Sequence, residues 1–276
     1  MEFIKAIIIG IVQGITEWLP ISSTGHMILF EKLLQMNVSD SFSEMFRVVI
    51  QFGSILAVVV LYFTQLNPFS KTKTEIKKRQ TWNLWFKVIL AIIPSAVFGL
   101  LFDDWFNAHF YNYVVVAIAL IVYGVAFIVI EKRHKNIAPK VETVENIPYR
   151  TAIGIGLFQV LSLIPGTSRS GSTILGGILL GVSRTAAAEF SFFLAIPTML
   201  GASALKLIKY FVDGNSLFTG TEWGILIIGC ATAFVVSLAA IKALMGYVRR
   251  HSFSAFGVYR IILGAVVLGY YIFTLI

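Results

Sequence analysis

The sequence predicts an all-α polytopic membrane protein with six transmembrane helices and two re-entrant helical hairpins in inverted-topology repeats. Three observations lead to this fold class. The chain is strongly apolar, two segments in its two halves match each other, and its basic residues are concentrated in a few loops. Hydrophobic residues make up 57% of the 276 residues and charged residues 13%, and the mean hydropathy is +0.84. These values lie outside the range of soluble globular domains.

The apolar runs have the length of membrane helices, since about 20 residues are needed to cross the hydrocarbon core. Six runs reach or approach that length: Val48–Phe63, Leu84–Phe102, Phe110–Ile130, Ser191–Ile208, Trp223–Leu244 and Phe256–Ile276. No loop between them is long enough to fold alone. Residues 1–276 are therefore expected to form a single integral membrane domain, with a first repeat at about 1–131, a second at about 150–276 and a cytoplasmic linker between them.

The two matched segments are Gly10–Leu29 and Gly156–Leu175, which align at an offset of 146 residues. The identical pairs are Gly10/Gly156, Gln13/Gln159, Ser22/Ser168, Gly25/Gly171, Ile28/Ile174 and Leu29/Leu175. Each segment is interrupted, at Pro20 or at Pro165-Gly166, and proline cannot continue a helix. Each half therefore begins with two short helices, which suits a hairpin that enters the bilayer and leaves on the same side.

Breakers divide each half of the chain into five predicted helices. In the first half they are Glu2–Leu19, Ser23–Leu34, Glu44–Phe63, Leu84–Phe102 and Phe110–Ile130. In the second half they are Arg150–Leu163, Gly171–Leu180, Thr185–Ile208, Trp223–Tyr247 and Phe256–Ile276. The last three of each half cross the membrane. Because three is odd, the two repeats must have opposite orientations.

The charged loops agree with this topology. Basic residues fill the segments Lys71–Arg79, Glu131–Arg150 and Arg249-Arg250, which the positive-inside rule places in the cytoplasm. The segments Asp103–Trp105 and Asp213–Glu222 then lie outside. The net charge of +8 thus reflects topology, and no nucleic-acid partner is expected. The first hairpin enters from outside and the second from the cytoplasm, so their turns should face each other across a polar pocket.

The first hairpin carries reactive groups. Gln13 and Glu17 are four residues apart and share one helix face, and Ser23 and His26 follow soon after Pro20. Ionisable groups in a membrane segment are costly and usually functional. Two plainer interpretations stay open at this point: the hydroxyl groups cap the next helix, and Glu17 and His26 form a structural buried pair.

The second hairpin resembles an anion cradle. Its turn has the sequence PGTSRSGST over Pro165–Thr173 and opens a helix, whose N-terminal amides and dipole favour an anion. Ser168, Ser170 and Thr173 add hydroxyl donors, and the Arg169 guanidinium matches two phosphate oxygens. We expect phosphate or diphosphate binding here, the alternative being that Arg169 only neutralises Glu17.

Together the two hairpins supply what phosphoryl transfer needs, namely charge neutralisation, a positioned nucleophile and a proton donor. Glu17 is also the expected ligand of a divalent cation, Mg²⁺ or Ca²⁺. With Gln13 it forms a thin metal shell, which substrate oxygens and water would have to complete.

Two long motifs carry a resemblance to a known family. QGITEWLPISSTGH looks like the (Glu/Gln)-x-x-x-Glu element followed by Ser-Ser-Thr-Gly-His, and PGTSRSGSTILGGILLGVSR resembles the Pro-Gly-x-Ser-Arg-Ser motif. Both belong to the bacterial undecaprenyl-diphosphatases, the bacitracin-resistance family, and the resemblance covers essentially the whole chain. It implies six membrane helices with two re-entrant pairs. It also implies hydrolysis of undecaprenyl diphosphate to the monophosphate, which recycles the carrier lipid for peptidoglycan synthesis, with a requirement for a divalent cation.

The resemblance also implies a set of functional residues: Gln13, Glu17, Ser23, His26, Ser168, Arg169 and Thr173. Arg169, Ser168 and Thr173 would bind the diphosphate, and Glu17 would organise metal or water. Either Ser23 or His26 would be the nucleophile, and we favour Ser23 with His26 as its base. Gln13 stands at the first acidic position of the family element, which weakens the case for a two-carboxylate metal site.

One rival function remains. Inverted repeats with broken helices also occur in transporters, so a transporter or flippase of an anionic polyprenyl phosphate lipid is the alternative. In either case we expect a multi-pass protein of the bacterial plasma membrane whose site opens to the outer face. Its partners would be a polyprenyl diphosphate lipid and the membrane lipids, and the sequence leaves a homodimer open.

Overall fold

The computed structural model describes residues 1–214 and 217–275. Two predicted segments extend beyond them: the external loop Asp213–Glu222 at residues 215 and 216, and the last predicted helix at Ile276. The described residues form helices and no strand, apart from one isolated bridge between Val141 and Val182. Six of the helical segments described are long and apolar enough to cross a membrane, as predicted.

The helices follow the predicted order. The first half contains α1 (Glu2–Thr16), α2 (Ser23–Leu33), α3 (Asp40–Val49), α4 (Gln51–Leu61), α5 (Phe63–Leu66), α6 (Glu75–Phe110) and α7 (Tyr113–His134). The second half contains α8 (Tyr149–Val160), α9 (Arg169–Leu179), α10 (Arg184–Val212), α11 (Gly220–Val248) and α12 (Ser254–Leu275). Two short 3₁₀ segments, η1 (Val144–Asn146) and η2 (Leu161–Leu163), precede and follow α8.

One predicted helix is divided in the structure. The run Glu44–Phe63 was expected to be continuous, whereas α3 ends at Val49 and α4 begins at Gln51. Neighbouring helices make this break tolerable, because the Ser203 hydroxyl donates to the Val48 carbonyl at 3.1 Å and the Cys230 thiol to the Val49 carbonyl at 3.6 Å. Backbone groups that leave the helical pattern at membrane depth need such partners.

The long helix α6 exceeds the prediction at both ends, since it runs from Glu75 to Phe110 instead of from Leu84 to Phe102, and the predicted external loop Asp103–Trp105 is therefore helical. The early start has a local cause. The prediction followed the apolar run alone, but the charged segment before it is also helical. Its first turn carries Glu75, and the Lys78 ammonium bonds to that carboxylate at 2.7 Å, an i,i+3 pair that favours helix. The basic segment Lys71–Arg79 is thus a loop that continues into a helix.

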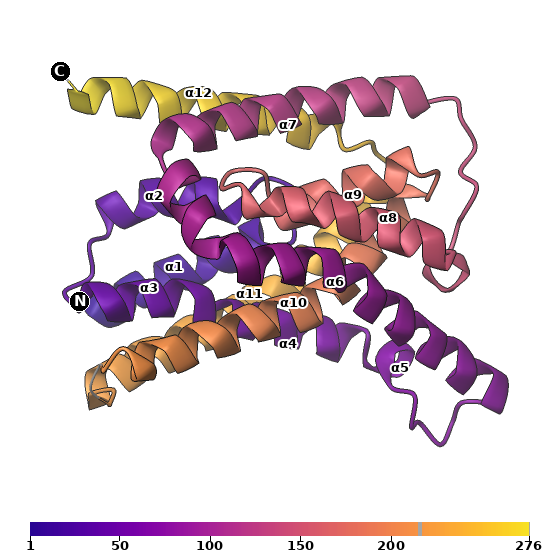
Figure 1. Ribbon diagram of the computed structural model, residues 1–276, viewed down its shortest axis with the longest axis horizontal. Helices are drawn as coiled ribbons and strands as arrows, with labels where there is room; N and C mark the ends of the chain where they lie inside the picture. The colour runs from indigo at the N-terminus through magenta and orange to yellow at the C-terminus, as the bar shows by residue number, and fades with distance from the viewer. Residues whose placement is uncertain (215–216, 276) are drawn as a thin grey trace.

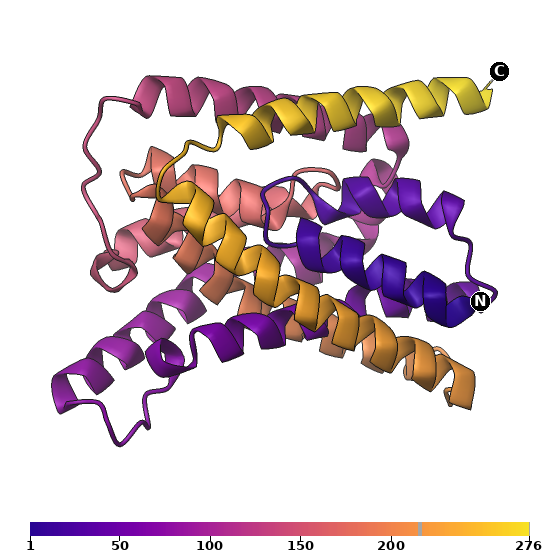
Figure 2. The same cartoon turned by 180° about the vertical axis from the view of Figure 1, so that it is seen from behind.

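The two hairpins enter the helix bundle from opposite ends. In Figures 1 and 2, α1 and α2 run from the end that holds both chain termini to the middle and back. The pair α8 and α9 does the same from the other end, where the segments 67–74, 135–148 and 249–253 lie. The predicted gathering of the basic loops at one end is therefore confirmed. The re-entrant position of the hairpins in a bilayer stays a prediction.

Each hairpin packs on a long helix of the other repeat. Helix α1 lies along α11, and its counterpart α8 lies along α6. The matched glycines Gly10 and Gly156 make both approaches possible. A Cβ atom at Gly10 would lie 2.9 Å from the Gly229 carbonyl oxygen, and one at Gly156 would overlap the backbone of Ala91. Only glycine lets these backbones approach so closely.

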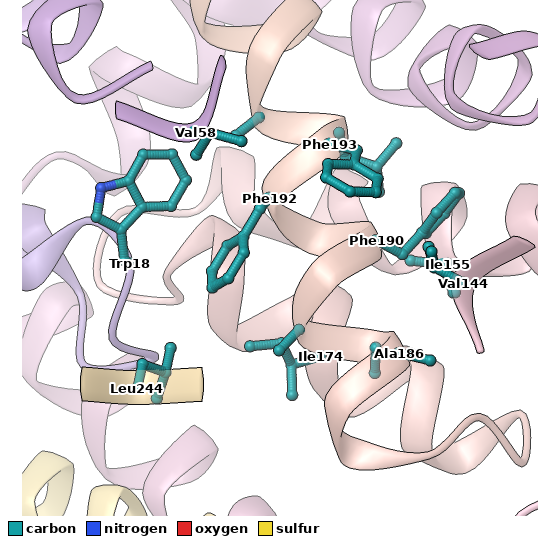
Figure 3. Close-up of a cluster of buried hydrophobic side chains, with 14 of the residues drawn as sticks. Trp18, Val58, Val144, Ile155, Ile174, Ala186, Phe190, Phe192, Phe193 and Leu244 are labelled. Carbon is teal, nitrogen blue, oxygen red and sulfur yellow. The ribbon is translucent and has the colours of Figure 1, made fainter. Parts of the chain in front are cut away.

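A buried aromatic cluster joins the two hairpins to α10. Trp18, in the turn after α1, is fully buried and meets Phe192 of α10 edge to face, with ring centroids 5.3 Å apart. Figure 3 shows Phe192 between Trp18 and Ile174 of α9, with Phe190 and Phe193 on the same helix. Such packing fixes the turn of the first hairpin against α10, next to the site described below.

Candidate active site

The two hairpin turns have the same backbone geometry. Ser22 and Ser168 are the only non-glycine residues in the described part of the chain with positive φ, at 70° and 71°. Each is the N-cap of the following helix, and its hydroxyl accepts a hydrogen bond from Gly25 or Gly171 at 3.3 and 3.1 Å. The capping that the sequence suggested for the first hairpin is present, and the second hairpin has the same cap. Positive φ at serine is strained, and strain of this kind often occurs at functional sites.

Glu17 and Arg169 connect the two turns. The Arg169 Nη2 group donates to Glu17 Oε1 at 2.9 Å, and both side chains are largely buried. Arg169 Nη1 donates to the Ser191 carbonyl at 2.8 Å, and the guanidinium lies over the Trp18 ring, 5.5 Å from its centroid. The buried Arg169 Nε has no hydrogen-bond partner. In this structure Arg169 is thus the counter-ion of Glu17, and it keeps one donor unused.

The other carboxylate oxygen of Glu17 gathers groups from the first hairpin. Oε2 accepts from the Ser23 hydroxyl at 3.1 Å and from the Gln13 amide at 3.0 Å. The predicted shared face of Gln13 and Glu17 is therefore confirmed. Ser23, the first residue of α2, directs its proton to Glu17, which is the arrangement of a hydroxyl beside a proton acceptor.

His26 is buried and has different partners. Its Nδ1 lies 2.7 Å from the Ser22 carbonyl oxygen, and its Nε2 lies 2.7 Å from the Tyr259 hydroxyl of α12. Since a carbonyl only accepts, Nδ1 carries the proton, and in a neutral ring Nε2 accepts from Tyr259. Burial lowers the pKa of His26 and the charge of Arg260 lowers it further, against an opposing effect of the Ser22 hydrogen bond. His26 therefore pairs with Tyr259, while Ser23 pairs with Glu17.

Two hydroxyls of the second turn bind protein atoms. The Ser170 hydroxyl donates to the carbonyl oxygens of Glu17 and Leu19, at 3.2 and 3.3 Å. The Thr173 hydroxyl lies 2.7 Å from the Ser191 hydroxyl and donates to the Arg169 carbonyl at 2.9 Å. Both residues are buried. They tie the second turn to the first and to α10, and their predicted contact with a diphosphate stays a prediction.

A polar cavity of about 190 Å³ lies where the two turns meet. Four of the predicted site residues line it: Glu17, Ser23, Ser168 and Arg169. Gln13, His26, Ser170 and Thr173 are not among the lining residues but are bonded to groups of the two turns. The predicted polar pocket between the hairpins is thus present, and its wall contains an acid, a hydroxyl and a guanidinium side by side.

The sequence analysis missed several residues of this region. Gln51, Ser162 and Thr198 also line the cavity, from α4, η2 and α10. Gln51 and Thr198 each interrupt an apolar run, and that was the available signal. Arg260 is fully buried in α12 and bonds to carbonyl groups of both turns. A charge inside the run Phe256–Ile276 should have marked it, because charges within membrane segments are rarely incidental.

The oxygen atoms around the cavity are suitable ligands for a hard cation. Carboxylate, amide and hydroxyl oxygens are the ligands that Mg²⁺ and Ca²⁺ prefer. Glu17 is the one carboxylate among the residues that line the cavity, and the described residues contain no group of three His, Cys, Asp or Glu side chains able to hold a metal ion. A cation at this cavity would therefore have to be held jointly with the oxygens of a phosphate ligand and with water, and its presence stays a prediction.

The sequence is similar to a known protein family and to several known proteins. The family model described as bacitracin resistance protein BacA matches residues 6–266. An undecaprenyl-diphosphatase of Streptococcus thermophilus is 58% identical to this chain over 270 residues. The aligned region covers 98% of this chain and 93% of the Streptococcus protein. One from Enterococcus faecalis is 57% identical over 270 residues, covering 98% of both chains. Undecaprenyl-diphosphatase 1 of Clostridioides difficile is 58% identical over 271 residues, covering 98% of this chain and 97% of its own.

Proposed function

The chain belongs to the bacitracin resistance protein BacA family, and from this premise we propose that it is an undecaprenyl-diphosphatase. It is an enzyme that hydrolyses undecaprenyl diphosphate to undecaprenyl phosphate and inorganic phosphate. The reaction recycles the carrier lipid for peptidoglycan synthesis and underlies bacitracin resistance. One observation carries the assignment to the site: the cavity brings Ser23, Glu17 and Arg169 together from the turns of two opposed hairpins.

The second turn supplies the phosphate site in this proposal. Arg169 and Ser168 line the cavity at the N-terminus of α9, where the helix dipole favours an anion. The Arg169 guanidinium is bonded to Glu17 and to the Ser191 carbonyl, so a phosphate oxygen would share or replace one of these partners. Ser170 and Thr173 support this turn through their bonds to the first hairpin and to α10, and we propose that they hold the cradle in shape.

Ser23 is the nucleophile that we propose. Its hydroxyl passes a proton to Glu17, its hydrogen-bond acceptor, while Ser23 Oγ attacks the terminal phosphorus. A Ser23–phosphorus bond forms, the bond to the bridging oxygen breaks, and undecaprenyl phosphate leaves. Water then cleaves the phosphoserine and releases inorganic phosphate. The assignment that the sequence favoured, with His26 as the base of Ser23, would require Nε2 to exchange Tyr259 for Ser23.

A divalent cation completes the proposal. Glu17 would hold Mg²⁺ or Ca²⁺ together with Gln13 or water and the phosphate oxygens of the substrate. When bound, the cation supplies positive charge that offsets the charge of the diphosphate. Arg169 then holds and orients the phosphate, while the hydroxyl of Ser23 stays directed at the same carboxylate.

The decisive experiment is phosphate release by the purified protein in detergent. We expect undecaprenyl diphosphate to be hydrolysed in the presence of Mg²⁺ or Ca²⁺, and Glu17→Ala to abolish the reaction. The opposed hairpins also suit a transporter of anionic polyprenyl phosphate lipid. Translocation of undecaprenyl phosphate across proteoliposomes by the Glu17→Ala variant would support that second activity, and absence of hydrolysis by the wild type would refute the first.

The protein is a multi-pass membrane protein that acts on a polyprenyl diphosphate lipid. We propose that it resides in the bacterial plasma membrane with the basic end in the cytoplasm and the catalytic site open to the outer face. Cysteine labelling of the two ends in intact cells tests this orientation. A homodimer stays a prediction, which cross-linking in native membranes can test.

A further inference from the structure

Arg260 bonds to both hairpin turns at once. Its side chain is fully buried in α12, a helix that belongs to neither hairpin. Nη1 donates to the Pro20 carbonyl oxygen at 3.1 Å, and Nη2 donates to those of Gly166 and Thr167 at 2.8 and 2.9 Å. One rigid guanidinium therefore connects the two turns across the interface between the repeats.

Equivalent carbonyl groups of the two turns accept hydrogen bonds from this guanidinium. Pro20 and Gly166 correspond at the 146-residue offset of the repeats. Each precedes by two residues the serine with positive φ, Ser22 at 70° or Ser168 at 71°. Arg260 thus binds the equivalent carbonyl group of each repeat, two residues before the strained serine. A planar fork with fixed N–H directions sets the distance between two such acceptors in a way that a single-point donor cannot.

The charge of Arg260 has no carboxylate partner among the described ion pairs. Its hydrogen-bond acceptors are neutral carbonyls, and its guanidinium carbon lies 5.4 Å from the centroid of the Tyr123 ring. A buried charge without a counter-ion is costly, so such a residue is retained where it does something that a neutral one cannot. Here it also leaves the region of the turns with a net positive charge, because Glu17 and Arg169 neutralise each other.

We propose that Arg260 is a positioning residue of the active site. It sets the separation between Ser23 on the first turn and Arg169 on the second, the two groups between which the terminal phosphate has to be held. This inference rests on the proposed function, since it assigns Ser23 and Arg169 to the same phosphate. An error of about 1 Å in such a separation can lower turnover by about a hundredfold, even where binding of the remote part of the substrate is intact.

The test compares Arg260→Lys with the wild type and with a matched control, Arg184→Lys. Arg184 begins α10 and is held by a buried partner, Glu131, although its own side chain is 36% exposed, and none of its described bonds reaches a turn. For each variant, kcat and KM for undecaprenyl diphosphate are measured in detergent with Mg²⁺, and the melting temperature is measured in parallel. Lysine keeps the charge but cannot bridge both carbonyls, so this variant separates geometry from charge.

For Arg260→Lys we expect kcat to fall at least about tenfold with KM within about threefold of the wild type, a pattern that indicates loss of transition-state positioning. Arg184→Lys should retain kcat, whatever its effect on the melting temperature. The proposal is overturned if Arg260→Lys retains the wild-type kcat, or if Arg184→Lys loses as much kcat at the same loss of stability. A wild type that releases no phosphate would refute the proposed function instead.

A second variant keeps the proposal testable if Arg260→Lys does not fold. Tyr123→Leu removes the ring against which the guanidinium packs and leaves all three carbonyl bonds chemically possible. If Arg260 acts by position, this variant lowers kcat with little change in KM. If kcat is unchanged, the precise placement of the guanidinium has no effect on turnover and the proposal fails.

Discussion

Ser22 and Ser168 occupy the same strained region of the backbone map, at φ values of 70° and 71°, although 146 residues separate them. Each hydroxyl also caps the helix that follows it. The repeat has therefore kept a costly conformation in both copies. That conformation aims the next residue, Ser23 in one turn and Arg169 in the other, into the cavity.

The first prediction concerns the stability of these turns. Ser22→Ala loses the cap and keeps the unfavourable φ, so it should destabilise the protein by about 1 kcal/mol. Ser22→Gly loses the same hydroxyl, but glycine adopts positive φ freely and is itself tolerated as an N-cap, so it should be close to neutral. Thermal unfolding in detergent measures both. An alanine variant more stable than the glycine variant would contradict this account of the turn.

Arg169 should be essential for turnover. Arg169→Ala removes both the phosphate donor and the counter-ion of Glu17, and we expect kcat/KM to fall by about 10²- to 10³-fold. Arg169→Lys should recover little, because an ammonium lacks the planar fork that directs separate nitrogens at Glu17 and at the Ser191 carbonyl. The exposed linker variant Lys135→Ala serves as the control. Near-normal turnover of Arg169→Ala would remove the cradle from the mechanism.

The chemical nature of the trapped intermediate identifies the nucleophile. If Ser23 attacks, quenching during turnover yields a phosphoserine, which survives acid and is absent from Ser23→Ala. If His26 attacks, the product is a phosphohistidine, which acid destroys. Treatment of the quenched enzyme with acid and then with base distinguishes the two. An acid-labile adduct that persists in Ser23→Ala would exclude the assignment of Ser23.

Removal of divalent cations should stop the reaction. Chelation with EDTA should abolish phosphate release, and Mg²⁺ or Ca²⁺ should restore it. Glu17→Gln should be inactive at every cation concentration, because it lacks both the proton acceptor of Ser23 and the carboxylate charge that a hard cation requires. In Gln13→Glu a second carboxylate should lower the concentration of cation needed for half-maximal activity. Full activity in the presence of excess chelator would show that no cation is required.

His26 should make stability depend on pH. The folded protein lowers its pKa below the ordinary value of 6.5, so at neutral pH the ring is neutral and Nε2 accepts from Tyr259. As the pH falls below about 6.5, the unfolded chain binds a proton that the folded chain resists, and stability decreases. The melting temperature should therefore drop between pH 7 and pH 5.5, and less so in His26→Gln. Equal slopes for the two proteins would show that His26 is not the group responsible.

Local sequence features predicted much of the site. Pro20 and Pro165-Gly166 indicated the turns, and the repeat offset paired Pro20 with Gly166. The i,i+4 spacing of Gln13 and Glu17 predicted the amide beside the carboxylate, which lie 3.0 Å apart. The directions of the side chains in a tight turn are harder to predict from the sequence. Ser170 and Ser168 are two residues apart in the same motif, yet one bonds to the first hairpin and the other lines the cavity.

Long-range contacts explain what the sequence did not reveal. Arg260 reaches Pro20 across 240 residues and Tyr259 reaches His26 across 233 residues, so no local pattern connects either pair. The break between α3 and α4 falls at Ile50, which is neither a proline nor a glycine, so the sequence does not mark it. It depends on donors from α10 and α11, which become visible only when the helices are packed.

The distance along the chain between Glu17 and Arg169 has a consequence for biogenesis. The acid and its counter-ion are 152 residues apart. At ribosomal rates of about 5–20 residues per second, roughly 8–30 s pass between their syntheses. During that interval the first hairpin lacks the charge that neutralises Glu17, as well as α11, against which α1 packs. The active site can therefore close only after the second half of the chain has been synthesised.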